Sequence, residues 1–253
     1  LKTVAKANVI FDGADSGYTT LPAPESVKPS PGAKYLHVAS NETIGGLQWK
    51  AFPATGDVPL VADMSSDILG RKLDMSQFGV VVAGAQKNLG PAGVTVVVIR
   101  KELVAAGREG LPAYLSYRTH AEKDSLSNTP PVFCIHALSL VMKWITAQGG
   151  VEAVEAANRT KASLLYGVID QNPDFFRCPV DPEVRSTMNA VFRLPTEELE
   201  AEFIAGTAKE GMVGLKGHRS VGGIRVSMYN ALPLESVEAL TAYMTSFAAS
   251  HGV

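Results

Sequence analysis

The sequence predicts an α/β protein, with a mostly parallel sheet in its first part and a smaller α/β unit after it. Short apolar runs alternate with turn-rich segments through the first hundred residues. These runs are nearly continuous in Val, Ala and Ile, which is typical of strands buried on both faces of a parallel sheet. Two helical patterns follow residue 131, and strand and helix patterns alternate beyond Asp174. Such an order indicates a second, smaller α/β unit.

The first part is expected to contain five strands and two long irregular stretches. Residues 1–7 are typical of the end of a helix that stops at Asn8. The Pro-, Gly-, Ser- and Thr-rich stretch 19–33 predicts a surface loop. The second stretch, 107–131, is long enough to indicate a functional or interface segment. The expected strands are residues 9–11, 35–39, 60–62, 78–83 and 95–99.

Helices are predicted over residues 132–148 and 151–169, with Gly149 and Gly150 ending the first of them. The expected inward positions are Phe133, Ala137, Val141, Met142 and Ile145 in the first helix, and Val154, Ala157, Ala162, Leu165 and Val168 in the second. After them we expect a strand at 188–194, a helix at 197–210, a strand at 223–228 and a helix at 234–249. The predicted domains are residues 1–148 and 149–253.

Bulk composition excludes several classes of function. A net charge of −2 over 253 residues gives no reason to expect nucleic acid or an anionic membrane surface as a partner. No apolar run approaches the length of a membrane span. The two cysteines, Cys134 and Cys178, have neither metal-site spacing nor the pattern of a disulfide framework, so no metal is expected and a reducing compartment fits.

Lys87 is the first candidate catalytic residue. It lies in a tight glycine-rich corner within 80–93, between two apolar runs. A partly desolvated amine at the mouth of a sheet suits Schiff-base formation with a carbonyl, whereas the alternative is a solvated turn lysine. Upstream, the apolar run in 58–66 ends at Asp63. An acid and a lysine at the ends of neighbouring strands fit pyridoxal phosphate: the lysine holds the aldehyde, and the acid keeps the ring nitrogen protonated.

Two arginines and a histidine within eight residues form a second candidate cluster. His218, Arg219 and Arg225 lie on glycine-rich backbone beside an expected strand. Arg225 could bind a carboxylate through two parallel hydrogen bonds, while His218 and Arg219 could hold a phosphate. The cluster therefore suits a dianionic ligand, and the alternative is a solvated basic turn.

The chain resembles the phosphoserine aminotransferases, pyridoxal-phosphate enzymes of class V and fold type I. The resemblance covers essentially the whole chain, as the C-terminal two-thirds of the family's sequence. The N-terminal part of the large domain, with its glycine-rich phosphate loop and ring-stacking aromatic residue, is expected to be missing. The matching stretches, in the family's order, are Asn41–Ile44, Ala62–Ser66, Gly84–Gly93, Asn128–Pro131, Leu165–Asp170 and Gly217–Arg225.

The resemblance implies a role for each matching position. Lys87 would form the Schiff base and later move the proton between the substrate's α-carbon and the cofactor's C4′. Asp63 would pair with the ring nitrogen, Thr43 would hydrogen-bond the cofactor, and Gln86 would contact its phosphate.

Asn128 and Thr129 match residues that reach the cofactor phosphate of the other subunit, which implies a homodimer with shared active sites. An alternative for this Asn-Thr-Pro-Pro segment is a turn that caps the following helix.

The implied reaction belongs to serine biosynthesis: amino transfer between O-phosphoserine and 2-oxoglutarate on one side and 3-phosphohydroxypyruvate and glutamate on the other. One alternative is another fold type I enzyme, such as an alanine–glyoxylate aminotransferase or a sulfur-removing lyase, which His218 and Arg219 disfavour because those substrates lack a phosphate. The other is a non-catalytic fragment that dimerises or binds the cofactor weakly. The expected location is the cytoplasm, or a plastid after removal of a transit peptide.

Overall fold

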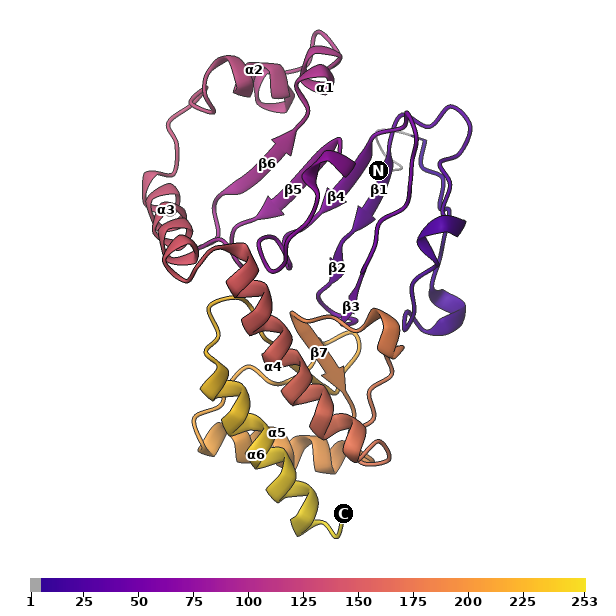
Figure 1. The fold of residues 1–253 in the computed structure, drawn as a ribbon, viewed down its shortest axis with the longest axis vertical. Helices are drawn as coiled ribbons and strands as arrows, with labels where there is room; N and C mark the ends of the chain where they lie inside the picture. Colours follow the sequence, from indigo (N-terminus) through magenta and orange to yellow (C-terminus); the bar gives the residue numbers. More distant parts are fainter. Residues whose placement is uncertain (1–5) are drawn as a thin grey trace.

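The computed structural model describes residues 6–253, so most of the helix end expected at 1–7 lies outside the described residues. Its main sheet has four strands in the order β1 (Leu36–Ala39), β4 (Leu60–Asp63), β5 (Val80–Gly84) and β6 (Thr95–Ile99) (Figure 1). The β1–β4 and β4–β5 pairs are parallel, and β5–β6 is antiparallel. The prediction of a mostly parallel sheet is therefore confirmed. The connection 85–94 is too short for a parallel crossover, which explains the direction of β6.

The parallel strands bring three segments of the chain together at one edge of the sheet. Asp63, the last residue of β4, is in register with Ala39 of β1 and Val82 of β5. The backbone bonds continue past the strand ends, because the Ser40 amide donates to the Asp63 carbonyl at 2.9 Å. The residues that follow β1, β4 and β5 consequently lie side by side, at the edge where ligands bind in open α/β sheets.

Two expectations about the strands are wrong. Residues 9–11 form no strand: Val9 is 68% exposed, and none of the described residues pairs with this segment. An apolar run becomes a strand only where a neighbour satisfies its backbone groups. The expectation that the strands are buried on both faces is also wrong for the edge strand β6, where Val98 is 48% exposed. The central positions Leu60 and Val81, by contrast, are each 1% exposed.

Four short elements were not expected from the sequence. They are the hairpin strands β2 (Asn41–Glu42) and β3 (Leu47–Gln48) and the helices α1 (Lys101–Ala105) and α2 (Tyr117–Glu122). The loop at 19–33 is confirmed apart from a 3₁₀ turn at Pro24–Ser26. The stretch 107–131 is less irregular than expected, since it contains α2 and a further 3₁₀ turn. Elements this short carry no periodic apolar pattern.

The helices α3 (Val132–Ala147) and α4 (Val151–Gln171) occur where the sequence predicts them. Gly149 and Gly150 separate them with φ of 100° and 83°. The predicted inward faces are wrong in part. Phe133 is 77% exposed and Ala157 is exposed, and a different residue, Lys161, is buried in α4. Among the described residues, no single helix has the length and hydropathy to cross a membrane; only α3 and α4 taken together do, and they are bent by 84°.

The C-terminal elements follow the predicted order: β7 (Asn189–Phe192), α5 (Glu197–Lys209), β8 (Ile224–Ser227) and α6 (Leu234–Ser250). The two strands pair antiparallel, and the helices pack beside them (Figure 1). Their core is rich in aromatic rings that meet edge to face, for example Phe203 with Phe247 at 5.3 Å between centroids. Such pairs add to the free energy of burial.

Two separate clusters of buried apolar residues support the division of the chain into two domains. One cluster surrounds β1, β4 and β5, and the other surrounds α4, α5, α6, β7 and β8. We propose a boundary between residues 148 and 149, at the turn between α3 and α4. Limited proteolysis checks it, because cleavage confined to either cluster would contradict this boundary.

A set of buried asparagines, which we call the asparagine seam, joins the two clusters. Asn41 donates to the Asn189 side chain at 2.9 Å, and Asn158, which also donates to Asn230, donates to the Gly70 carbonyl at 3.0 Å. Hydrogen bonds between buried amides are directional and specify one arrangement, although Asn158 Oδ1 has no partner among the described residues. The seam consists of Asn41, Asn88, Asn158, Asn189 and Asn230, each at most 7% exposed.

Lys161, beside the seam, holds the turn that follows β8. Its side chain is 1% exposed, and its amine donates to the carbonyl oxygens of Tyr229 and Leu232 at 3.0 Å each. Burial lowers the pKa of Lys161 to about 8. The segment that carries Arg225 is therefore anchored at its far end by an amine with backbone partners.

Candidate active site

Lys87 lies in the turn after β5, and its amine points to a hydroxyl. Its Nζ donates to Thr43 Oγ1 at 2.6 Å, and Thr43 directly follows β2. Partial burial lowers the pKa of Lys87 from its ordinary value; the Asp63 carboxylate opposes this shift, and the Arg225 guanidinium adds to it. A lowered pKa increases the neutral, nucleophilic fraction of the amine near neutral pH.

Asp63 presents a carboxylate beside this amine. The Ser65 amide donates to Asp63 Oδ1 at 2.9 Å and closes a turn typical of an acid at a strand end. Asp63 Oδ2 has no hydrogen-bond partner among residues 6–253, and the side chain is exposed. One carboxylate oxygen is thus held by backbone, while the other is open to a ligand.

Ser65 is a site residue to which the sequence analysis assigns no role. Its Oγ accepts a hydrogen bond at 3.0 Å from the amide of Gly84, the last residue of β5. Ser65 therefore ties the turn of Asp63 to the strand that leads to Lys87. The only signal in the sequence is a hydroxyl two residues after an acid at the end of a strand.

Glu42 was also missed, because an acid in a two-residue strand has no recognisable pattern. Partial desolvation raises the pKa of Glu42 above its usual value, the Asp63 carboxylate raises it further, and Lys87 lowers it. The charged form of the Lys87 amine is consequently stabilised by two carboxyl groups, those of Asp63 and Glu42.

Gln86 is exposed beside Lys87 and folds back over the preceding strand end. A Cβ added at Gly84 would lie 2.7 Å from Gln86 Oε1, so the exposed Gln86 side chain would have to move aside. Contact between Gln86 and a cofactor phosphate remains a prediction.

Arg225, in β8, places a guanidinium close enough to Lys87 to affect its pKa. Its Nε is buried and has no hydrogen-bond partner in the described part of the chain. A buried donor without a partner is energetically costly, and a carboxylate ligand would satisfy it.

His218 and Arg219 lie in the tight loop that precedes β8. The His218 Nδ1 accepts from the Ser220 amide at 3.3 Å, which leaves Nε2 as the ring's donor. Arg219 is exposed. The loop needs glycine, because a Cβ on Gly217 would lie 1.9 Å from the Gly222 carbonyl oxygen.

Asn128 and Thr129 are both exposed, and the structure does not bring them into the Lys87 cluster. The Asn128 side chain donates to the Thr129 carbonyl at 3.0 Å. Their segment, between α2 and α3, passes outside the β6 edge of the sheet (Figure 1). The expectation that they serve a second subunit's cofactor stays a prediction.

The residues gathered here fit pyridoxal phosphate by their chemistry. A half-buried amine can hold the aldehyde, and a carboxylate with one free oxygen can hold the ring nitrogen's proton. The hydroxyl of Thr43 and the unpaired Nε of Arg225 add a donor for the cofactor and one for an anionic substrate.

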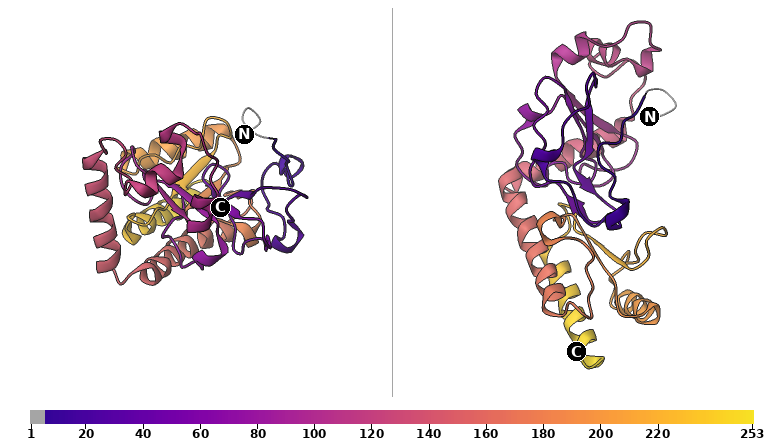
Figure 2. Two further views of the ribbon diagram at one scale, coloured as in Figure 1. Left: turned by 90° about the horizontal axis from the view of Figure 1, so that it is seen from above. Right: turned by 90° about the vertical axis from the view of Figure 1, so that its right-hand side faces the viewer.

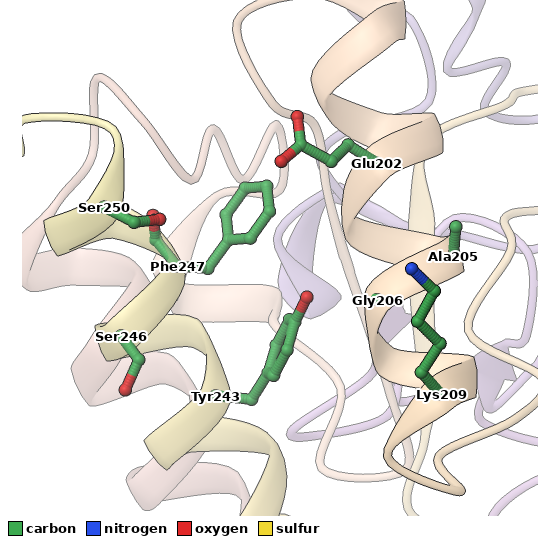
Figure 3. A pocket seen from close by; sticks show the side chains of 8 residues that line it. All are labelled: Glu202, Ala205, Gly206, Lys209, Tyr243, Ser246, Phe247 and Ser250. Atoms are coloured by element: carbon green, nitrogen blue, oxygen red, sulfur yellow. The ribbon is translucent and has the colours of Figure 1, made fainter.

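The hollow of about 390 Å³ between α5 and α6 is not part of this site (Figure 3). Tyr243 and Phe247 from α6 face Gly206 and Lys209 from α5 across it. None of the candidate site residues lines this hollow, and it is shallow and open to solvent.

Known proteins resemble the chain throughout. The family model described as "Aminotransferase class-V" matches residues 9–240. The structure is similar to a phosphoserine aminotransferase from Bacillus circulans subsp. alkalophilus, with a TM-score of 0.97 and 54% identity over 99% of this chain and 70% of that one. It is also similar to the pyridoxal-phosphate-bound phosphoserine aminotransferase of Trichomonas vaginalis, with a TM-score of 0.84 and 38% identity over 90% of this chain and 64% of that one.

A plant relative matches at a similar level. The chain is 50% identical over 99% of its length to the chloroplastic phosphoserine aminotransferase 1 of Arabidopsis thaliana. The chain spans 58% of that relative's length, which is somewhat under two-thirds.

Proposed function

The chain belongs to the phosphoserine aminotransferases within class V, and we propose that its Lys87 cluster is the active site of a pyridoxal-phosphate-dependent amino transfer. In the full-length protein the proposed partners are O-phosphoserine with 2-oxoglutarate, and 3-phosphohydroxypyruvate with glutamate. The observation that carries this proposal is the Lys87 amine, 2.6 Å from Thr43 Oγ1 and beside Asp63, at the carboxyl ends of parallel strands.

When bound, pyridoxal phosphate supplies an electron-accepting ring conjugated to the substrate's amino nitrogen. The chain's residues supply proton transfer and orientation. Lys87, with its lowered pKa, would take the proton from the substrate's α-carbon and later return it. Thr43 orients its amine, and Asp63, held by the Ser65 amide, would keep the ring nitrogen protonated.

The substrate's two anionic ends suit the basic residues around β8. Arg225 would bind the carboxylate, because its buried Nε lacks a partner. The donor Nε2 of His218 and the exposed guanidinium of Arg219 would bind the phosphate. An alanine–glyoxylate or sulfur-removing activity would leave His218 and Arg219 without a role.

A substrate comparison tests this function in the full-length protein supplied with pyridoxal phosphate. We expect kcat/KM for O-phosphoserine to exceed that for serine by at least about 100-fold, since an unfilled polar site is costly. The Arg219→Ala variant should lose about 10-fold or more on O-phosphoserine and little on serine. Equal use of the two amino acids by the natural protein would contradict the proposal. Lys216→Ala, an exposed cation nearby, is the control.

We also propose a homodimer that uses the exposed face of α3. This face carries Val132, Phe133, Ile135, Leu140 and Trp144, which are 36–77% exposed. Figure 2 shows α3 at the outer margin of the molecule in the view from above. Exposed apolar patches of this kind mark interfaces. The position of Asn128 and Thr129 just before α3 supports a role for them in a partner's site.

The Phe133→Asp variant should convert the dimer to a monomer, because it places a charge in the apolar face. Analytical ultracentrifugation of the full-length protein measures this. Val213→Asp is the matched control, since Val213 is 80% exposed but far along the chain, after α5. A natural protein that sediments as a monomer, or a Phe133→Asp variant that stays dimeric, would exclude this interface.

For location, we propose the cytoplasm or a plastid, and the chloroplastic name of the plant relative supports the second. Imaging of the full-length protein with a C-terminal fluorescent tag distinguishes the two, and secretion would contradict both.

A further inference from the structure

Asn88 has a side-chain amide that is hydrogen-bonded through both its nitrogen and its oxygen, although no step of the proposed reaction needs it. It follows Lys87 directly, and only 5% of its surface is exposed. Its Nδ2 donates to the carbonyl oxygens of Ile68 at 3.2 Å and Ser66 at 3.4 Å. Its Oδ1 accepts from the backbone amide of Asn230 at 3.0 Å.

The partners of Asn88 belong to the other functional segments of the site. Ser66 and Ile68 lie in the turn that follows Asp63, the proposed ring-nitrogen partner. Asn230 lies in the turn that follows β8, the strand of Arg225. One side chain thus connects the segment of the amine, the segment of the acid and the segment of the substrate arginine.

We propose that Asn88 is a positioning residue that fixes the Lys87 turn against the Asp63 turn and the β8 turn. What Lys87 does there rests on the proposed function, but the connection itself rests on the hydrogen bonds alone. An amide is suited to this position because it donates twice and accepts at a fixed distance. A shift of about 1 Å in a reacting group can cost about 100-fold in rate.

The experiment compares the full-length natural protein with Asn88→Ala and with the control Asn158→Ala. Asn158 belongs to the same seam, is 1% exposed and bonds Gly70 and the Asn230 side chain, but has no bond to the Lys87 segment. Because it shares Asn230 with Asn88, it controls for loosening of the β8 turn and leaves the bonds to the Lys87 segment intact. Thermal melting should show that both variants lose stability. Only Asn88→Ala should change the pKa of the Lys87 amine and lower kcat.

The first readout needs no cofactor. Competitive acetylation of the cofactor-free protein, followed by mass spectrometry of the Lys87 peptide, measures the pKa of that amine. Burial holds the pKa of Lys87 below its ordinary value. In Asn88→Ala the loosened turn should expose the amine and bring its pKa back towards that value, whereas Asn158→Ala should leave it unchanged.

The second readout is the split between kcat and KM with O-phosphoserine. We expect kcat to fall about 10- to 100-fold in Asn88→Ala, because the proton-transfer group is misplaced, with a smaller change in KM. In Asn158→Ala, kcat should stay within about twofold of the natural value. If Asn88→Ala does not fold, Asn88→Ser is measured in its place, since its hydroxyl is too short to reach all three partners.

The outcomes separate this inference from the proposed function. If the Asn88 variant matches Asn158→Ala in both readouts, the positioning role is wrong. A natural protein without amino-transfer activity, whose Lys87 pKa still responds to Asn88→Ala, would overturn the proposed function and support the positioning role.

Discussion

Replacing Lys87 with alanine in the full-length protein is expected to abolish amino transfer, with kcat falling by about a thousandfold or more. The visible absorbance of the lysine-bound cofactor should disappear with it. Among the lysines in residues 6–253, only Lys87 joins a lowered pKa, a hydroxyl partner and a neighbouring carboxylate at the strand ends. Absorption spectra and kcat of the same sample measure both effects.

Lys209→Ala is the control for this substitution. Lys209 is exposed on α5, at the rim of the hollow in Figure 3, and should leave both signals unchanged. A Lys87→Ala protein that keeps the absorbance band would show that another amine holds the cofactor, and the assignment of Lys87 would be wrong.

Replacing Arg225 with alanine should raise KM for the amino-acid substrate by about 10- to 100-fold, because a charge-assisted pair of hydrogen bonds is lost. Arg225→Lys should rescue little, since an ammonium cannot form two parallel bonds. The pH profile provides a second test. The Arg225 cation lowers the pKa of Lys87, so its removal raises that pKa. Because Lys87 has a free amine only once substrate has displaced it from the cofactor, the alkaline rise of kcat should then move to higher pH.

Arg177→Ala is the matched control for Arg225. Arg177 is exposed, its Nε bonds the Asp174 carbonyl, and its backbone pairs with Arg193, just after β7, rather than with β8. An Arg225→Lys variant with natural KM would show that a simple positive charge suffices, and would contradict the two-bond assignment.

The parts of the fold that depend on local pattern were predictable from the sequence. The helices at 132–147 and 151–171 and the alternating C-terminal elements carry periodic apolar residues. The parallel arrangement also predicted that Asp63 and Lys87 would meet, because the carboxyl ends of parallel strands share an edge. The strand predicted at residues 9–11 was wrong because strand formation needs a neighbouring strand to pair with, and no local pattern reveals whether one is present.

The supporting residues of the site could not have been found in this way. Asn41 and Asn189 are separated by 148 positions, and Asn88 and Asn230 by 142. Asparagine is most often exposed or in turns, so its pattern indicates loops rather than a buried contact. Ser65 acts through a backbone amide, which leaves no signature in composition. The sequence thus identifies groups with their own chemistry and misses those that position them.

The asparagine seam also limits how the sequence can change over evolutionary time. Removing Asn41 leaves the side-chain oxygen of Asn189 buried without its donor, and removing Asn158 does the same to the side-chain oxygen of Asn230. The effects of two such substitutions are therefore not additive, and the second can restore part of what the first removes. Loss of Asn41 or Asn158 alone is therefore the change that we expect selection to remove, unless Asn189 or Asn230 changes with it.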